Sequence, residues 1–212
     1  MNLRAVTPKD YDLILELDKK VYPTKNPVTK KIIDRWYANN PEFGLIYETE
    51  GVIDGICIAI PLNNEGWNKL IDGKINESEI DSKHLFDINS TKEIALHIYH
   101  IEKSNKNLKN MHNICLNDLA KIIKNKDLTI IGLSAFAVTS SGLNLFSEKL
   151  GFQESHLVCD EHILEKYGLK IVAETKKEAE ELVNNGYKYI NRCQMLVLER
   201  KIPNKLWAIF DS

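Results

Sequence analysis

The chain has 212 residues, of which 43% are hydrophobic and 27% are charged, a composition typical of a globular protein with a buried core. Its 28 lysines and arginines nearly balance its 30 aspartates and glutamates, which gives a formal net charge of -2. This balance gives no support for a nucleic-acid or membrane-surface partner, because such partners normally require a concentrated basic face. Apolar runs such as GICIAI are too short to span a bilayer.

The first residues and the cysteines indicate the compartment. The N-terminal stretch MNLRAVTPKD lacks the apolar run and small-residue cleavage site of a signal peptide. The four cysteines, Cys57, Cys115, Cys159 and Cys193, form no CxxC pair and lie among apolar residues. We therefore expect reduced thiols in the core, a cytoplasmic location and no metal site.

In the first half of the chain, hydrophobic spacing predicts a strand, two helices and a hairpin. Thr7 can cap the first helix, and Pro27 falls in the first turn of the second helix. The pair Glu50-Gly51 is typical of a tight antiparallel turn. The predicted elements are a strand at 3–7, helices at 8–22 and 26–40, and strands at 43–50 and 52–62.

Residues 63–91 are polar and rich in turns, and we interpret them as an insertion with a short helix at 67–71. The second half then alternates strands and helices, with strands at 92–103 and 128–138 separated by a helix at 114–125. A helical crossover of this kind makes the two strands parallel. The later elements are a helix at 141–150 that stops on Gly151-Phe152, strands at 155–159 and 169–173, a helix at 175–186 and a closing strand at 189–199.

Together these elements predict a single α/β domain over residues 1–212, with a C-terminal extension from about residue 160. An antiparallel hairpin that leads into a parallel pair gives a mixed, mostly antiparallel sheet with helices on both faces. The extension can cover a cleft, extend the sheet or form a homodimer surface.

The order of elements over residues 1–152 resembles the GCN5-related N-acetyltransferase (GNAT) superfamily. The likeness is sharpest at LNLFSEKLGF, residues 143–152, which is similar to the family's A-x-x-L-Y-E-K-x-G-F helix. The resemblance implies two central parallel strands that splay apart, with acetyl-CoA as co-substrate between them. It also implies that the strand at 92–103 and the following loop hold the pantetheine and the pyrophosphate, since amides at a helix N-terminus stabilise an anion. The implied cofactor-binding residues are Ile101, Lys106, Asn107, Lys109, Asn110, Met111, His112 and Asn113, together with Ser140 and Asn144 at the next helix.

The sequence departs from the family's pattern at two places. The family's loop carries Arg or Gln followed by x-x-G-x-G, whereas this chain has NKNLKNMHNI at residues 105–114. Asparagine tolerates left-handed backbone angles best after glycine, so Asn110 can replace a glycine, and Lys106 and Lys109 add positive charge. Ser147 stands where the family often has the tyrosine that protonates the leaving thiolate, and serine is a poor acid at neutral pH.

Direct attack on a thioester needs a base for the amine proton. Strand alternation places His100 and Glu102 on one face of the central strand, and His97 and Tyr99 on the other. Either His100 or Glu102 can serve as the base; the alternative is that both close hydrogen bonds at the rim of the sheet.

Other residues near the predicted cleft have structural alternatives. Ser140 and Ser141 can be simple helix caps, and Asn144 can lie on the exposed face. The aromatic residues Trp36 and Tyr37 are better explained by core packing than as a wall for the acceptor.

The sequence therefore predicts a cytoplasmic enzyme that transfers an acetyl group from acetyl-CoA to a primary amine of a small molecule or peptide. Attack is direct, with Glu102 or His100 as base and Ser147 at the position of the acid. The alternative is a catalytically inactive GNAT-fold module that senses a ligand or binds a protein, which the missing glycines and Ser147 motivate.

Overall fold

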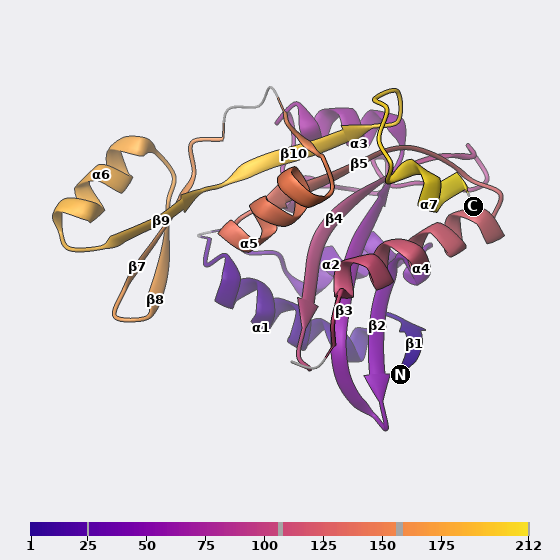
Figure 1. Ribbon diagram of the computed structural model, residues 1–212, viewed down its shortest axis with the longest axis horizontal. Coiled ribbons are helices and arrows are strands. Elements are labelled where there is room, and N and C mark those ends of the chain that lie inside the picture. Colours follow the sequence, from indigo (N-terminus) through magenta and orange to yellow (C-terminus); the bar gives the residue numbers. More distant parts are fainter. Residues whose placement is uncertain (25, 106–107, 156–158, 212) are drawn as a thin grey trace.

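The computed structural model describes residues 1–24, 26–105, 108–155 and 159–211. Its main sheet has seven strands in the order β1-β2-β3-β4-β5-β10-β6 (Figure 1). Within this sheet β4 and β5 run parallel, and the other pairs are antiparallel. The predicted mixed, mostly antiparallel sheet is confirmed. The strands are β1 (Asn2–Ala5), β2 (Gly44–Thr49), β3 (Val52–Leu62), β4 (Glu93–Lys103), β5 (Thr129–Ala137), β6 (Gln153–Glu154) and β10 (Gln194–Glu199).

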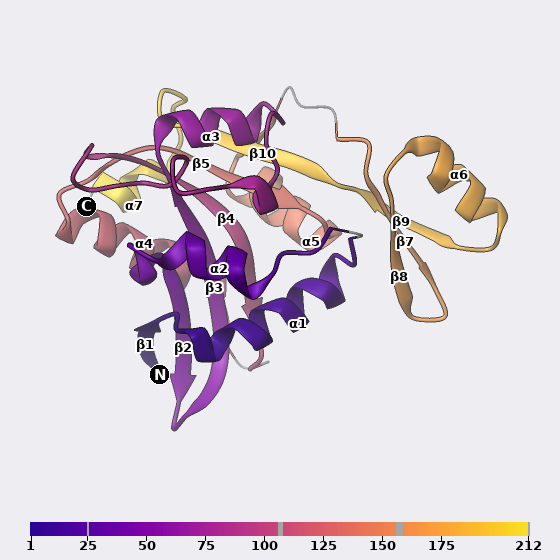
Figure 2. The same cartoon turned by 180° about the vertical axis from the view of Figure 1, so that it is seen from behind.

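Helices cover both faces of this sheet, as predicted. One face, towards the viewer in Figure 2, carries α1 (Tyr11–Val21), α2 (Lys30–Tyr37) and α3 (Asn64–Ile71). The opposite face carries α4 (Met111–Asn125), α5 (Ser140–Leu143), which continues as the π-helix η4 (Asn144–Lys149), and α7 (Trp207–Asp211). Short 3-10 turns are η1 (Pro8–Asp10), η2 (Pro41–Phe43) and η3 (Glu77–Glu79).

The core lies between the sheet and these helices, and its largest fully buried side chains include Trp36, Tyr47 and Phe43. Tyr37 is also buried, and its hydroxyl donates to the Ala59 carbonyl at 2.9 Å. Core packing, rather than an acceptor wall, is therefore confirmed for Trp36 and Tyr37. In the described part of the chain, no helix is both long and apolar enough to cross a bilayer.

Two local predictions for the first half of the chain have different outcomes. The turn at Glu50-Gly51 is confirmed, because both residues have positive φ, 52° and 80°, as a two-residue hairpin turn requires. The second helix starts later than predicted, at Lys30. Thr29 is extended (φ -119°, ψ 164°) and its carbonyl accepts the first helical bonds from Ile32 and Ile33, so Pro27 lies outside the helix.

The C-terminal segment forms a separate small sheet, which the sequence did not predict. The predicted closing strand at 189–199 is in fact two strands that break at the buried residue Cys193. β9 (Lys188–Arg192) pairs with β7 (His162–Lys166), whereas β10 pairs with β5. The order of the small sheet is β8-β7-β9, with β8 at Leu169–Ala173 and α6 (Lys176–Asn184) packed against it.

The small sheet and α6 project from one end of the main sheet, where β9 leads into β10 (Figure 1). The predicted strand at 169–173 and the predicted helix at 175–186 are confirmed as β8 and α6. The predicted strand at 155–159 falls largely on residues 156–158, which lie outside the described residues.

Candidate functional site

The two central parallel strands part midway. Their pairing begins at Glu93 and Thr129 and ends at Ile98 and Ala135, although β4 continues to Lys103 and β5 to Ala137. On the other side of β4, Ala59 pairs with Ile98 and Ile58 pairs with His100, so Tyr99 is an extra, unpaired residue. Such a bulge bends a strand and increases its twist. The bulge therefore lies where β4 leaves β5, and the predicted splaying of the two strands is confirmed.

A cavity of about 210 Å³, here called the gap cavity, occupies the space between the parted strands. Beyond Ile98, no strand of the described residues pairs with the edge of β4 that faced β5, so its backbone N–H and C=O groups can pair with an extended ligand. The walls come from α1, β4, β5 and the turn into α5 and η4: Val21, Ile98, Tyr99, His100, Ile101, Glu102, Phe136, Ala137, Val138, Thr139, Ser141, Gly142, Leu145 and Phe146.

Three of the predicted site residues, His100, Ile101 and Glu102, line the gap cavity together. Burial lowers the pKa of His100 to about 4, so its imidazole is neutral at pH 7. The buried Nε2 atom of His100 has no hydrogen-bond partner among the residues that the structure describes. Tyr99 also lines the cavity, although strand alternation places it on the opposite face from His100. The bulge and the open strand edge expose both faces of β4 at this point.

The loop before α4 has the conformation that the sequence suggested for Asn110. This residue has φ 54° and ψ 37°, the left-handed region in which asparagine is the best substitute for glycine. Its carbonyl accepts the amides of Asn113 and Ile114 at 2.9 and 3.2 Å. α4 therefore starts from Asn110, in the segment that follows β4.

Other predicted residues of this loop surround the start of α4. Met111 is buried, His112 is half-buried, and Lys109 and Asn113 are exposed. Burial and the nearby charge of Lys149 lower the pKa of His112, which places a lysine from η4 close to the first turn of α4. Lys106 and Asn107 lie outside the described residues.

The predicted residues on the following helix lie away from the gap cavity. Ser140 and Asn144 are exposed, and neither is among the residues that line the cavity. The Ser147 hydroxyl donates to the Leu143 carbonyl at 2.7 Å and does not line the cavity either. The alternative that Ser140 or Ser141 caps this helix is wrong. Thr139 is the cap, because its side chain accepts a hydrogen bond from the Gly142 amide at 3.0 Å.

The stop of this helix agrees with the sequence prediction. Gly151 has φ 75°, and Phe152 packs edge-on against Phe146 with ring centroids 5.1 Å apart. Because Phe146 also lines the gap cavity, the Gly-Phe stop fixes one wall of that cavity.

Sequence reasoning missed two acidic cavities next to the gap cavity. Their volumes are about 310 and 360 Å³, and their walls share Tyr22, Asn76, Glu77, Glu161 and Glu174. The first also contains Asp18, a buried residue on the apolar face of α1 at helical spacing from Tyr11 and Ile14. An acidic residue within an apolar helix face is unusual, so the sequence could have indicated Asp18 as a candidate site residue. No sequence pattern indicated the three glutamates.

A buried chain of side chains leads from α3 to Glu77. The Trp67 indole donates to the Ser134 hydroxyl at 3.0 Å, and this hydroxyl lies 3.0 Å from Nδ1 of His97. Nε2 of His97 lies 2.9 Å from the Glu77 carboxylate. An indole N–H can only donate, so Trp67 donates to Ser134. The Ser134 hydroxyl is then free to donate to Nδ1 of His97, and the Nε2–H group of His97 donates to the Glu77 carboxylate.

Comparison with known proteins gives structural likeness only. No family model and no curated protein matches the sequence. The loading GNATL domain of CurA from Lyngbya majuscula matches with a TM-score of 0.55 and 14% identity, over 93% of this chain and 96% of that chain. Naa50 from Arabidopsis thaliana, solved with the bisubstrate analogue CoA-Ac-MVNAL, matches with a TM-score of 0.51 and 9% identity, over 93% and 97%. The NatB acetyltransferase complex bound to a bisubstrate inhibitor matches with a TM-score of 0.50 and 14% identity, over 97% and 94%. This chain therefore has the GNAT fold.

Proposed function

We propose that the protein transfers an acetyl group from acetyl-CoA to a primary amine by direct attack. The observation that carries this proposal is the end of parallel pairing at Ile98 and Ala135, with the gap cavity beyond it. An extended ligand with amide groups can bond to the open edge of β4 as an additional strand would. The pantetheine arm of coenzyme A is such a ligand.

The first turn of α4 supports the same proposal. Amides at a helix N-terminus and the helix dipole stabilise a phosphate, and Asn110 holds the left-handed conformation that starts this helix. Lys149 and Lys109 add positive charge around it. In our proposal the pyrophosphate of acetyl-CoA binds here, and the thioester lies at the Ile98 end of the gap cavity.

The reaction needs the acceptor amine in its neutral form. Its nitrogen attacks the thioester carbon, the C–S bond breaks, and coenzyme A leaves as a thiolate. Attack makes the nitrogen positively charged and strongly acidic, so the weakly basic but neutral His100 imidazole is a sufficient proton acceptor. Backbone N–H groups on the open edge of β4 stabilise the developing oxyanion. Glu102, which lines the same cavity, is the second candidate base.

Isothermal titration with acetyl-CoA tests the cleft, with two adjacent serines as a matched pair. Both Ser140 and Ser141 are exposed, but only Ser141 lines the gap cavity. Ser141→Trp is expected to weaken acetyl-CoA binding strongly, whereas Ser140→Trp leaves it unchanged. No detectable binding to the unaltered protein at millimolar acetyl-CoA would exclude the transferase. Binding without release of coenzyme A in the presence of any amine would favour the ligand-sensing alternative.

A further inference from the structure

The two acidic cavities lie directly beside the gap cavity. Tyr99 lines both the gap cavity and the first acidic cavity, and Phe136 lines both the gap cavity and the second. The ring of Tyr22 packs edge-on against Phe136 at 5.9 Å and lines both acidic cavities. Each acidic cavity therefore borders the gap cavity at one shared side chain, Tyr99 or Phe136.

These cavities have the size of a small-molecule site. Volumes of about 310 and 360 Å³ fall within the range of roughly 300–1,000 Å³ that such sites occupy. Because their walls share five residues, the two cavities adjoin each other around Glu77, Glu161 and Glu174.

The described residues of the walls include acidic side chains but no basic one. Asp18, Glu77, Glu161 and Glu174 line the first cavity, and among the described residues that line either cavity there is no lysine or arginine. Burial, and then the charge of Glu77, raises the pKa of Asp18 to about 6. Burial raises the pKa of Glu161 as well, with further contributions from Glu77 and Glu174. The Tyr22 hydroxyl donates to the Glu161 carboxylate but neutralises no charge, so a bound cation would relieve the repulsion between Glu77 and Glu161.

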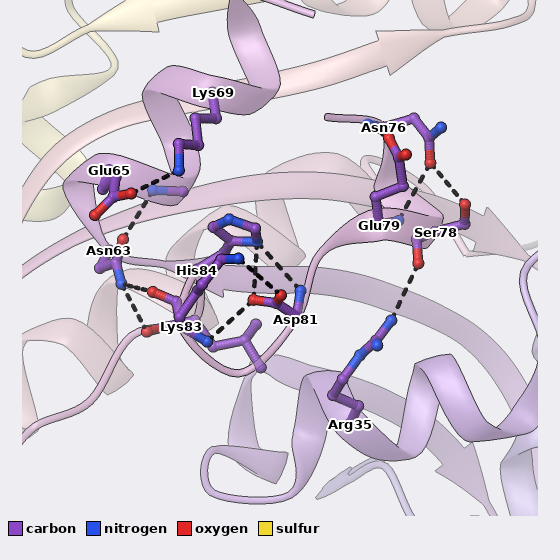
Figure 3. Close-up of polar contacts among 12 residues, drawn as sticks. Arg35, Asn63, Glu65, Lys69, Asn76, Ser78, Glu79, Asp81, Lys83 and His84 are labelled. Carbon is purple, nitrogen blue, oxygen red and sulfur yellow. Dashed lines mark hydrogen bonds and ion pairs between the residues drawn. The ribbon is translucent and has the colours of Figure 1, made fainter. Parts of the chain in front are cut away.

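Glu77 is held rigidly in the wall of both cavities. Its carboxylate is fixed by the fully buried His97, at the end of the chain from Trp67 and Ser134. Its sequence neighbours Asn76 and Ser78, both labelled in Figure 3, are also held by hydrogen bonds. Arg35 donates to the Ser78 carbonyl at 3.0 Å, and Asn76 and Glu79 form a reciprocal capping box around the turn. A carboxylate supported in this way is pre-organised for a ligand.

The geometry favours an extended organic cation over a metal ion. In residues 1–24, 26–105, 108–155 and 159–211, no group of three or more His, Cys, Asp or Glu side chains is placed to hold a metal ion. The carboxylates are spread along the cavity instead: Asp18 lies beside Tyr99, and Glu161 and Glu174 flank strands of the small sheet. Burial, and then the charge of Glu77, raises the pKa of Tyr99, so a ligand whose ammonium group binds Glu77 can extend to Tyr99.

We propose that the acceptor is a small amine with a second positive charge, which Glu77 and Glu161 bind while the reacting amine lies past Tyr99 at the gap cavity. This inference rests on the proposed acetyl transfer, because it names the acceptor of that reaction. The bound ammonium stays charged, whereas the attacking amine must be neutral. An acceptor with two amino groups therefore satisfies both ends of the site.

The test compares three acceptors with four carbons each, namely 1,4-diaminobutane, 1-aminobutane and 4-aminobutan-1-ol. Diamines of three, five and six carbons are added to match the distance between the two ends of the site. Release of coenzyme A from acetyl-CoA gives kcat/KM. The diamines are expected to exceed the monoamine by about 10- to 100-fold, the effect of one charge-assisted hydrogen bond. Glu77→Gln and Glu161→Gln should reduce that ratio and leave acetyl-CoA binding unchanged. Glu65→Gln is the control, because this carboxylate is exposed on α3 and pairs with Lys69.

Direct titration of the diamines separates this inference from the proposed function. Equal kcat/KM for the monoamine and the diamines would overturn the inference and leave the transferase intact. Diamine binding that Glu77→Gln abolishes, without any turnover, would support the cationic site and exclude the transferase. Absence of both diamine binding and diamine turnover would overturn the inference, whatever acetyl-CoA does.

Discussion

Replacing His97 tests the buried chain that holds Glu77. His97→Leu removes a hydrogen bond to a carboxylate, which contributes about 1.5–3 kcal/mol, and one to the Ser134 hydroxyl, which contributes about 0.5–1.5 kcal/mol. The Glu77 side chain is 17% exposed, so water replaces part of the first bond. We expect a loss of about 2–3 kcal/mol in the free energy of unfolding, and hence a fall in Tm of about 4–12 °C for a chain of this size.

Urea denaturation of a double-mutant cycle isolates the bond to Glu77. The cycle consists of the unaltered protein, His97→Leu, Glu77→Ala and the double variant. The expected coupling free energy is about 1.5–3 kcal/mol, since the two side chains touch each other. A coupling below about 0.5 kcal/mol would be that of independent sites, and it would refute the argument that His97 fixes Glu77.

Three further predictions address stability and the cofactor loop. Burial raises the pKa of Asp18 to about 6 in the folded protein, above the usual aspartate value of about 3.9. The folded state therefore binds more protons than the unfolded state, and stability falls as pH rises from about 4 to 6. Asp18→Asn, which can still accept from Tyr99, should be more stable than the unaltered protein at pH 7 by at most about 3 kcal/mol, and equal urea midpoints at pH 4 and pH 7 would contradict this. Gly132→Ala places a Cβ 2.2 Å from the Trp67 ring, so we expect a loss of about 1–3 kcal/mol in the free energy of unfolding and a shift in tryptophan fluorescence. Adding Trp67→Leu to this variant removes the clash and should recover part of the lost stability. Asn110→Ala should cost about 1–2 kcal/mol of stability and weaken acetyl-CoA binding in calorimetry, whereas Asn110→Gly should retain both.

The sequence predicted the elements whose patterns are local. The turn at Glu50-Gly51 and the helix stop at Gly151 follow from backbone preferences of single residues, and both are confirmed by positive φ values. The parallel arrangement of β4 and β5 followed from the helix between them. Their parting at Ile98 followed only from the family resemblance, because the bulge at Tyr99 leaves no signature in the residue types.

The elements that the sequence did not predict depend on pairing over long distances. Residues 189–199 form one continuous run, yet the chain changes sheets at Cys193, because β9 pairs with β7 and β10 with β5. Periodicity within a strand cannot reveal which neighbour it will find. The same limit applies to the acidic cavities, whose glutamates come from segments nearly a hundred residues apart.

In our proposal, the distribution of the acidic residues explains how a shared fold can serve a particular acceptor. The gap cavity is built from α1, β4, β5 and the turn into α5, which belong to the main sheet and the helices that cover it. Of the four carboxylates in the first acidic cavity, Asp18 lies on α1, Glu77 lies in the segment 63–91 that we interpret as an insertion, and Glu161 and Glu174 flank strands of the small sheet. Functional specificity resides in sites added to a scaffold and not in the scaffold itself. In our proposal the insertion and the small sheet therefore determine which amine is accepted, and the central strands bind acetyl-CoA and determine the reaction, acetyl transfer.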